Sequence, residues 1–380
     1  MSADPNSPIY LAHTYISNAR FHQRFTVEPT ATHGPLNVTY AEFGRQPDES
    51  GPPPTILLIP GMFSSRYLGI QLHAIADKIG VRVLVVDRPG MGGSTDVPLV
   101  QRMSTWVELV PRLLSHLGIQ HVALASHSAG TMYLLNTMYH CRDLLYPIHP
   151  TVHMLAPWVD PAHSLQTSMQ ILQYIPNKAF GVWHRIPKFF MLQAAPAFAS
   201  SGAVVKKVTD AFSSNDTTSQ DNSRQEKQRR HIEDAYGLSR DVQAELDNLM
   251  HKYMFEEETV GANSEALQCL RKEPNNTWGK CEDYEVFVRD FVALQRGRDR
   301  ESSPLKIQAY FAESDVMIGK KGQVYFEQRW CGTNEEYKDV VEFASTTVPG
   351  TDHDTLALSV EVWEPILKDL IRVLDNDHEQ

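Results

Sequence analysis

The sequence lacks the features that would place the chain in a membrane or on a nucleic acid. Its 380 residues contain no apolar run that approaches the length of a membrane span, so we expect no transmembrane segment. The 35 lysines and arginines are outnumbered by 46 aspartates and glutamates, which gives a formal net charge of −11. Because phosphate binding needs a basic face, this balance argues against a nucleic-acid partner.

Cysteine is scarce, and so are the patterns that hold metals or cofactors. The four cysteines are Cys141, Cys269, Cys281 and Cys331, and they show neither CxxC nor Cys/His spacing, which argues against a zinc site and a disulfide framework. The segment GMGGS lacks the spacing of a dinucleotide-binding loop. The first residues do not show the basic stretch and apolar core of a secretory signal. We therefore expect a cytoplasmic protein without metal or organic cofactor, and the sequence gives no indication of its oligomeric state.

Short apolar runs that predict buried strands alternate with amphipathic stretches that predict helices. The strands are expected within residues 55–59, 81–94, 121–130 and 151–158, with helices between them. Such alternation is typical of a parallel sheet covered by helices on both faces. Ahead of these strands, QRFTVEP and NVTYAEFG alternate apolar and polar residues and predict an antiparallel hairpin.

The strand pattern stops after Pro161 and resumes later in the chain. The intervening residues predict helices and loops, and the polar stretch 213–230 predicts a mobile surface loop or the start of a helix. Strands are then expected in KIQAYFAESD and VVEFASTTVPGTDHD, and helices in GQVYFEQRW and VEVWEPILKDLIRVL. We therefore expect an α/β fold in which a mostly parallel sheet flanked by helices is built from residues 1–161 and 304–380, with residues 162–303 inserted as a helical cap.

The pentapeptide SHSAG, centred on Ser128, lies between a predicted strand and a predicted helix. This is the setting of a nucleophile elbow, a sharp turn that presents its central residue at the end of the sheet. Small residues two positions before and after the centre, here Ser126 and Gly130, keep the turn clear of its neighbours. The pattern indicates a nucleophilic serine, and the alternative interpretation is a serine-rich strand end that happens to precede a helix.

A serine nucleophile needs a base within hydrogen-bond reach and a carboxylate that orients the base. Where a nucleophile elbow carries the serine, the acid and then the histidine follow it along the chain. Asp315 ends the first strand after the interruption, and His353 follows the last strand, so we expect both at the carboxyl edge of the sheet. A solvated loop histidine is the alternative for His353. The other acids that could orient it are Asp160, Glu313, Asp352 and Asp354.

The oxyanion that forms when a serine attacks a carbonyl needs preorganised donors, usually two backbone N–H groups. Ala129 is expected to supply one, because it follows the nucleophile at the N-terminus of a helix. Met62, in the strand end PGM, is expected to supply the other, with Phe63 as the alternative.

Together these segments resemble the α/β-hydrolase superfamily over nearly the whole chain. LLIPGMFSS is similar to its HGX oxyanion loop, VVDRPGMGGS to its DRPGxGxS turn and SHSAG to its GxSxG elbow, while AESDVMIG and GTDHD are similar to its acid and histidine loops. Pro60 stands where many members have histidine, and Ser126 replaces glycine, so no subfamily is assigned. The resemblance implies an α/β-hydrolase fold with a cap and an esterase-like or lipase-like activity. Asp87 and Arg88, in the DRPG turn, are interpreted as fixing that turn near the site rather than as catalytic.

The predicted function is hydrolysis of a carboxylic ester, thioester or lactone of a hydrophobic small molecule through an acyl-enzyme on Ser128. Acyl transfer or C–C bond hydrolysis by the same triad, and a non-catalytic ligand receptor built on the fold, are the alternatives. A group of apolar residues in the predicted cap either lines the substrate pocket or packs the cap on the core; its members are Phe180, Trp183, Phe189, Phe190, Met191 and Phe198.

Overall fold

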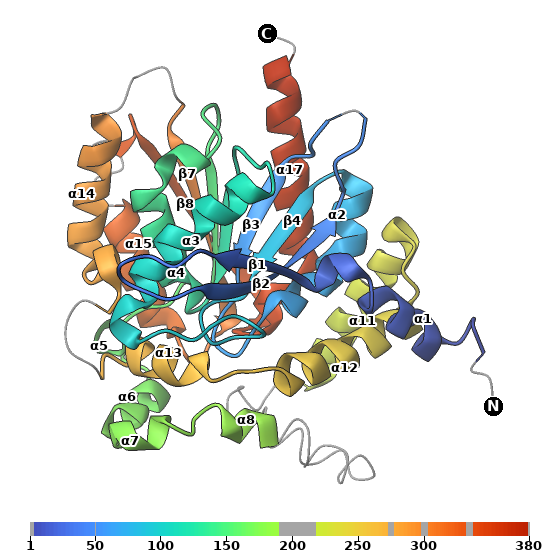
Figure 1. Cartoon of the computed structure of the whole chain (residues 1–380), viewed down its shortest axis with the longest axis horizontal. Helices are drawn as coiled ribbons and strands as arrows, with labels where there is room; N and C mark the ends of the chain where they lie inside the picture. The colour runs from blue at the N-terminus through green and yellow to red at the C-terminus, as the bar shows by residue number, and fades with distance from the viewer. Residues whose placement is uncertain are drawn as a thin grey trace.

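An eight-stranded sheet crosses the centre of the structure, and helices cover both of its faces (Figure 1). The computed structural model describes residues 4–49, 51–189, 218–272, 277–297, 303–331 and 337–378. The strands are β1 (Gln23–Val27), β2 (Leu36–Gly44), β3 (Thr55–Ile59), β4 (Arg82–Val86), β5 (Ala123–His127), β6 (Thr151–Leu155), β7 (Leu305–Ser314) and β8 (Val341–Asp352). Their order across the sheet is β1-β2-β4-β3-β5-β6-β7-β8. The β1–β2 and β2–β4 pairs are antiparallel and all others are parallel, which confirms the predicted hairpin and the mostly parallel sheet.

Helices precede the sheet, connect its strands and follow it. The α-helices are α1 (Pro8–Ile16), α2 (His73–Ile79), α3 (Arg102–His116), α4 (Gly130–His140), α5 (Pro161–Ser164), α6 (Thr167–Tyr174), α7 (Asn177–Phe180), α8 (Arg185–Phe189), α11 (Thr218–Tyr236), α12 (Arg240–Glu256), α13 (Gly261–Cys269), α14 (Tyr284–Arg296), α15 (Gly319–Cys331) and α17 (Val360–His378). Short 3₁₀ helices are formed by Ala19–Phe21, Arg66–Leu72, Leu99–Gln101, Arg142–Leu144, Gly279–Cys281 and Thr355–Leu358. Among the described residues, no helix has the length and apolar character needed to cross a membrane.

The central strands are buried on both faces, which is why their sequences are continuous apolar runs rather than alternating ones. Every residue of β3, β4 and β5 is buried. On β3, Leu57 and Ile59 point into an apolar cluster shared with α3, α4, α14 and α15, whereas Ile56 and Leu58 point into a second cluster shared with α1, α2, α12 and α17. The two clusters fix the sheet between its helical layers.

The chain between β6 and β7 contains α5 to α14. In Figure 1, α6, α7 and α8 form a layer below α12 and α13, on the side away from the sheet. Helix α14 differs from them, because Phe287, Val288 and Phe291 belong to one of the sheet's own apolar clusters. The predicted boundaries of the cap stay a prediction, and we propose that α6 to α13 form it while α14 belongs to the core. The polar stretch 213–230 lies in α11 from Thr218 onward, and its first residues fall outside the described residues.

Candidate active site

Ser128 occupies the sharp turn between β5 and α4. Its backbone adopts a φ of +50°, a left-handed conformation that a serine rarely takes and that the surroundings must enforce. The Ser128 N–H donates to the carbonyl of Leu155 on the adjacent strand (3.0 Å). A Cβ at Gly130 would lie 2.3 Å from the carbonyl oxygen of Ile59, so only glycine fits where α4 begins. The turn therefore places the serine at the carboxyl edge of the sheet, as the sequence pattern predicts for a nucleophile.

His353 and Asp315 reach this edge from the loops after β8 and β7. His353 Nε2 lies 2.8 Å from Ser128 Oγ, and His353 Nδ1 lies 2.8 Å from Asp315 Oδ2. The backbone N–H groups of Met317 and Ile318 both donate to Asp315 Oδ1 at 2.8 Å. With Nδ1–H donating to the carboxylate, Nε2 is left free to accept the serine proton. The three side chains thus form one continuous hydrogen-bonded chain, each member buried.

The charges in this chain stabilise one another. Burial by itself would lower the pKa of His353, but the Asp315 carboxylate, its hydrogen bond, and the nearby Asp354 and Asp352 together raise the pKa to about 9. Burial would likewise raise the pKa of Asp315, but the charge and hydrogen bond of His353 and the two backbone N–H donors outweigh it and hold the pKa below its ordinary value. The arrangement favours an ionised acid beside an imidazole that readily takes up a proton.

Three of the four other candidate acids have partners other than His353. Asp160 caps α5 by accepting from the N–H of Ala162 (2.8 Å), and it forms an ion pair with Arg271 (2.9 Å). Glu313 accepts from the N–H of Gly350 (2.7 Å). Asp352 accepts from the N–H of Thr355 (2.8 Å) and stabilises the turn that follows β8. None of these contacts orients the His353 ring, whereas Asp315 bonds to it directly.

His127, beside the nucleophile, is buried and bonded to the histidine loop. Its Nε2 lies 2.8 Å from the carbonyl oxygen of His353, and burial, with the charge of His353, lowers the pKa of His127 to about 3. His127 is therefore neutral and donates from Nε2. Possible metal-binding atoms of His127, His353 and Asp354 gather within 4.8 Å of one another. Both ring nitrogens of His353 are already bonded to Ser128 and Asp315, so this cluster is a poor metal site.

The loop after β3 passes directly beside the nucleophile. A Cβ at Gly61 would lie 3.0 Å from Ser128 Cβ and 2.8 Å from His127 Nδ1, so this close approach requires glycine. Met62 follows in the loop, and Ala129 begins the turn into α4. Among the residues that the structure describes, neither the Met62 nor the Ala129 N–H donates a hydrogen bond. Both N–H groups that the sequence predicts as oxyanion donors are therefore without an acceptor in the described part of the chain, and their role stays a prediction.

Arg88 fixes the loop that follows β3. Its Nη2 donates to the carbonyl of Gly61 (2.8 Å), and its guanidinium makes two hydrogen bonds to the fully buried carboxylate of Glu265 (2.7 and 2.9 Å). Glu265 also accepts from Tyr133 Oη (3.0 Å) and lies 3.3 Å from Arg102. The sequence interpretation of Arg88 as a turn-fixing residue agrees with these contacts. Glu265 carries no local sequence signal, since it lies on α13, 177 positions from Arg88.

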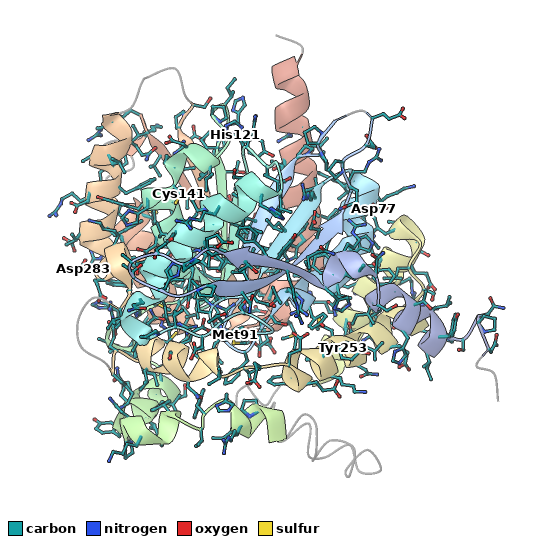
Figure 2. All side chains as sticks on the ribbon, in the orientation of Figure 1. Asp77, Met91, His121, Cys141, Tyr253 and Asp283 are labelled. Carbon is teal, nitrogen blue, oxygen red and sulfur yellow. The ribbon has the colours of Figure 1, made fainter. Side chains whose placement is uncertain are left out.

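Contacts at the turn after β4 join the insertion to the core. Asp87 accepts from Arg66 (2.6 Å), and Arg66 also bonds to Glu257, which directly follows α12. Figure 2 labels Met91 of this turn, in the core, and Tyr253 of α12, in the insertion. Helix α13 begins where the N–H of Gly261 donates to the carbonyl of Gly90 (2.9 Å).

Only some of the apolar residues of the predicted cap lie among the described residues. Phe180 is fully buried and packs with Ala266 of α13 and with Leu270, which directly follows that helix, and Trp183 and Met62 contact the same cluster. This favours packing for Phe180, in a cluster that reaches the loop beside Ser128. The side chains of Phe189, Phe190, Met191 and Phe198 lie outside the described residues.

Comparison with known proteins identifies relatives of this architecture. A model of the alpha/beta hydrolase family matches residues 56–359. A proline iminopeptidase of Lactobacillus helveticus is 28% identical over 144 residues, which make up 36% of this chain and 47% of that protein. The chain thus spans about half the length of the curated relatives that it matches.

Solved structures match over more of the chain. A carboxylesterase of Nitrososphaera gargenis has a TM-score of 0.51 and 13% identity, covering 93% of this chain and 100% of its own. Epoxide hydrolase A of Mycobacterium thermoresistibile has a TM-score of 0.53 and 14% identity, covering 92% of this chain and 98% of its own. At these identities the likeness concerns the fold.

Proposed function

This chain belongs to the alpha/beta hydrolase family, and on that premise we propose that it is a serine hydrolase that acts through an acyl-enzyme on Ser128. The observation that carries the proposal is the hydrogen-bonded chain from Asp315 through His353 to Ser128, with 2.8 Å at each link. The proposed substrate is a carboxylic ester, thioester or lactone of a hydrophobic small molecule.

In the proposed reaction, Ser128 Oγ attacks the substrate carbonyl while His353 Nε2 takes the serine proton. Asp315 stabilises the resulting imidazolium and keeps its ring in place. The N–H groups of Met62 and Ala129 donate to the oxyanion of the tetrahedral intermediate. His353 then protonates the leaving group, and a water molecule, deprotonated by the same imidazole, hydrolyses the acyl-enzyme and restores the serine.

The apolar surroundings support a hydrophobic substrate. Met62 contacts both the large core cluster and the cluster of Phe180, so the loop that would hold the oxyanion continues into apolar side chains of the insertion. Binding sites for small molecules are lined mainly by such side chains, with few polar groups. The predicted cytoplasmic location stays a prediction.

The test is steady-state hydrolysis of p-nitrophenyl esters with acyl chains from acetate to octanoate. We expect a preference for chains longer than acetate, and we expect Ser128→Ala to lower kcat by about 10³- to 10⁴-fold or more. Hydrolysis that survives in Ser128→Ala would rule out the proposed mechanism. Transfer of the acyl group to an added alcohol in preference to water would indicate the acyl-transfer alternative.

The match to a proline iminopeptidase supports a second candidate, release of an N-terminal proline from a peptide. That substrate carries a cationic amine, which calls for a free carboxylate near the site. Glu265 is already bonded to Arg88 and Arg102, so this buried carboxylate is not free to bind an amine. L-proline p-nitroanilide in the same assay separates the two candidates, and turnover faster than that of every ester would favour the peptidase.

A further inference from the structure

The outermost helices of the insertion expose an unusual number of large apolar side chains. They form a surface, which we call the α6–α8 face, whose exposed fractions are Leu165 46%, Ile171 60%, Tyr174 88%, Val182 47% and Ile186 47%. Isolated exposed apolar residues are ordinary, but five within 22 positions of the chain, on one layer of helices, favour an interaction site. In Figure 1 these helices lie at the bottom of the molecule, beyond α12 and α13.

The opposite side of the same helices is well packed, so the exposure is not a sign of an unfolded segment. Phe180 is fully buried against Ala266 and Leu270, and the carbonyl of Lys272 accepts a hydrogen bond from Asn177 (2.8 Å). The N–H of His184 donates to Asn263 (2.8 Å). The α6–α8 face is therefore presented outward by a structured layer.

The charge of this face is opposite to that of the rest of the molecule. Residues 161–189 contain no aspartate or glutamate, although the whole chain contains 46. Lys178 and Arg185 are exposed within the same stretch, beside the apolar residues. A local cationic surface on a protein of net charge −11 favours an anionic partner.

We infer that the α6–α8 face binds the surface of a membrane that contains anionic lipids. Apolar side chains that enter the headgroup region, flanked by tyrosine and by lysine or arginine, are the composition of an interfacial site rather than of a membrane span. A second copy of the chain fits less well, because a twofold contact through this face would place the cations of both copies in one interface with no carboxylate from residues 161–189 to balance them. The inference goes beyond the proposed hydrolysis and does not depend on it.

The face is joined to the site by packing. Met62 packs against the cluster of Phe180 on its inner side, and the preceding residue, Gly61, lies close to Ser128. A hydrophobic substrate held in a membrane would therefore meet the molecule on the side where the serine loop and the insertion are in contact. This link rests on the proposed function, whereas the membrane binding itself does not.

The experiment is sedimentation of the full chain with vesicles of phosphatidylcholine alone and of phosphatidylcholine with 30 mol% phosphatidylserine. We expect binding to the mixed vesicles, weaker binding to phosphatidylcholine, and a loss of binding as salt is raised. Ile171→Ser combined with Ile186→Ser, and Lys178→Glu combined with Arg185→Glu, should each weaken binding by about tenfold or more.

Matched variants elsewhere on the surface serve as controls. Ile148→Ser with Leu294→Ser removes two exposed apolar side chains away from the face, and Arg24→Glu with Lys78→Glu makes the same change in net charge. These controls should bind as the wild type does, and Ser128→Ala should also bind normally, because binding needs no catalysis.

Three outcomes would overturn the inference. They are no sedimentation of the wild type with either vesicle, equal losses in the face and control variants, and a dimer in solution that Ile171→Ser combined with Ile186→Ser dissociates. Hydrolysis of p-nitrophenyl acetate, a soluble ester, is measured in parallel. Unchanged acetate hydrolysis in a variant that no longer binds vesicles separates failure of the membrane site from failure of the serine site.

Discussion

At the scale of single residues, the arrangement around Ser128 combines a strained nucleophile with fixed partners. The positive φ of Ser128 is a conformation that costs free energy, and the close fit of Gly130 and Gly61 shows how tightly the neighbouring backbone encloses it. Ser126 Oγ is buried and, within the described residues, has no hydrogen-bond partner. The residue that departs from the family pattern thus fills the place of a glycine without adding a polar contact.

The identity of the acid gives a first prediction. Asp315→Asn should lower kcat/KM for p-nitrophenyl esters by about 10³- to 10⁴-fold, because an amide neither fixes the His353 tautomer nor stabilises its charged form. Asp160→Asn is the matched control and should retain most of the activity, since Asp160 pairs with Arg271 instead. If Asp160→Asn is the more damaging change, the assignment of the acid is wrong.

The raised pKa of His353 predicts an unusual pH profile. His353 acts as a base only when neutral, and its neighbours favour the protonated form, so activity should be low in acid and rise with pH to a midpoint above the ordinary histidine value of about 6.5. The measurement is kcat/KM for p-nitrophenyl acetate from pH 5 to pH 10, corrected for spontaneous hydrolysis. A midpoint at or below 6.5, or a flat profile, would contradict the electrostatic description of the site.

At the scale of secondary-structure elements, helix α13 connects the insertion to the catalytic loop. Glu265 on this helix is bonded to Arg88, and Arg88 in turn holds the carbonyl of Gly61. A carboxylate buried with two guanidiniums contributes little net stability, but removing it leaves the buried Arg88 without a carboxylate partner among the described residues, while Arg102 keeps Asp96. The contact therefore positions the oxyanion loop and ties it to the placement of the insertion.

Neutralising this carboxylate should be costly. We expect Glu265→Gln to lower the free energy of unfolding by about 3 to 5 kcal/mol, measured by urea denaturation, and to lower kcat more than it raises KM. Glu108→Gln, which weakens partly exposed contacts of Glu108 with Arg112 and His33, should cost less than about 1 kcal/mol. Equal effects of the two substitutions would show that the buried network has no special role.

At the scale of the whole molecule, buried neutral histidines link stability to pH. Burial, together with the charge of Arg20, lowers the pKa of His73 to about 4, and the Nδ1 of His73 accepts the N–H of Gly44 (2.9 Å). Protonation would break that bond. Because the folded pKa lies below the unfolded value, the unfolded chain binds more protons between the two, and stability is present above about pH 6.5 and lost as the pH falls toward 4.

We therefore expect His73 to account for about 2 kcal/mol of stability lost between pH 7 and pH 5. The measurement is urea unfolding at both values for the wild type, His73→Gln and the exposed control His13→Gln. His73→Gln should have the smaller pH dependence, because a glutamine cannot take up the proton. An undiminished pH dependence in that variant would assign the effect to other groups.

Local sequence patterns reveal the strands of the sheet and the chain order of the candidate catalytic residues. The buried strands and the hairpin follow from apolar runs and alternation, since one or both faces of each strand are covered, and the structure confirms them. The chain order of a serine, an acid and a histidine at strand ends predicts Ser128, Asp315 and His353, and the structure brings these three within hydrogen-bond distance. Their catalytic roles stay a prediction.

Other features depend on contacts between distant parts of the chain. Asp160 and Asp315 both follow strands, and their tertiary contacts separate them, because Asp160 pairs with Arg271 whereas Asp315 bonds to His353. The partner of Arg88 lies on a helix of the insertion with no motif of its own. The apolar residues of α6 have helical spacing whether they are buried or exposed, so the α6–α8 face is visible only when the side that packs on α13 is known.

The central claim is that Ser128 is the activated nucleophile, and covalent labelling tests it most directly. Intact-mass measurement after treatment with a fluorophosphonate should show a single adduct on the wild type. The matched control Ser126→Ala, which removes a serine hydroxyl two positions before Ser128, should show the same adduct. Ser128→Ala should show no adduct while keeping the far-ultraviolet circular dichroism of the folded wild type. An adduct on Ser128→Ala, or none on the folded wild type, would contradict the account.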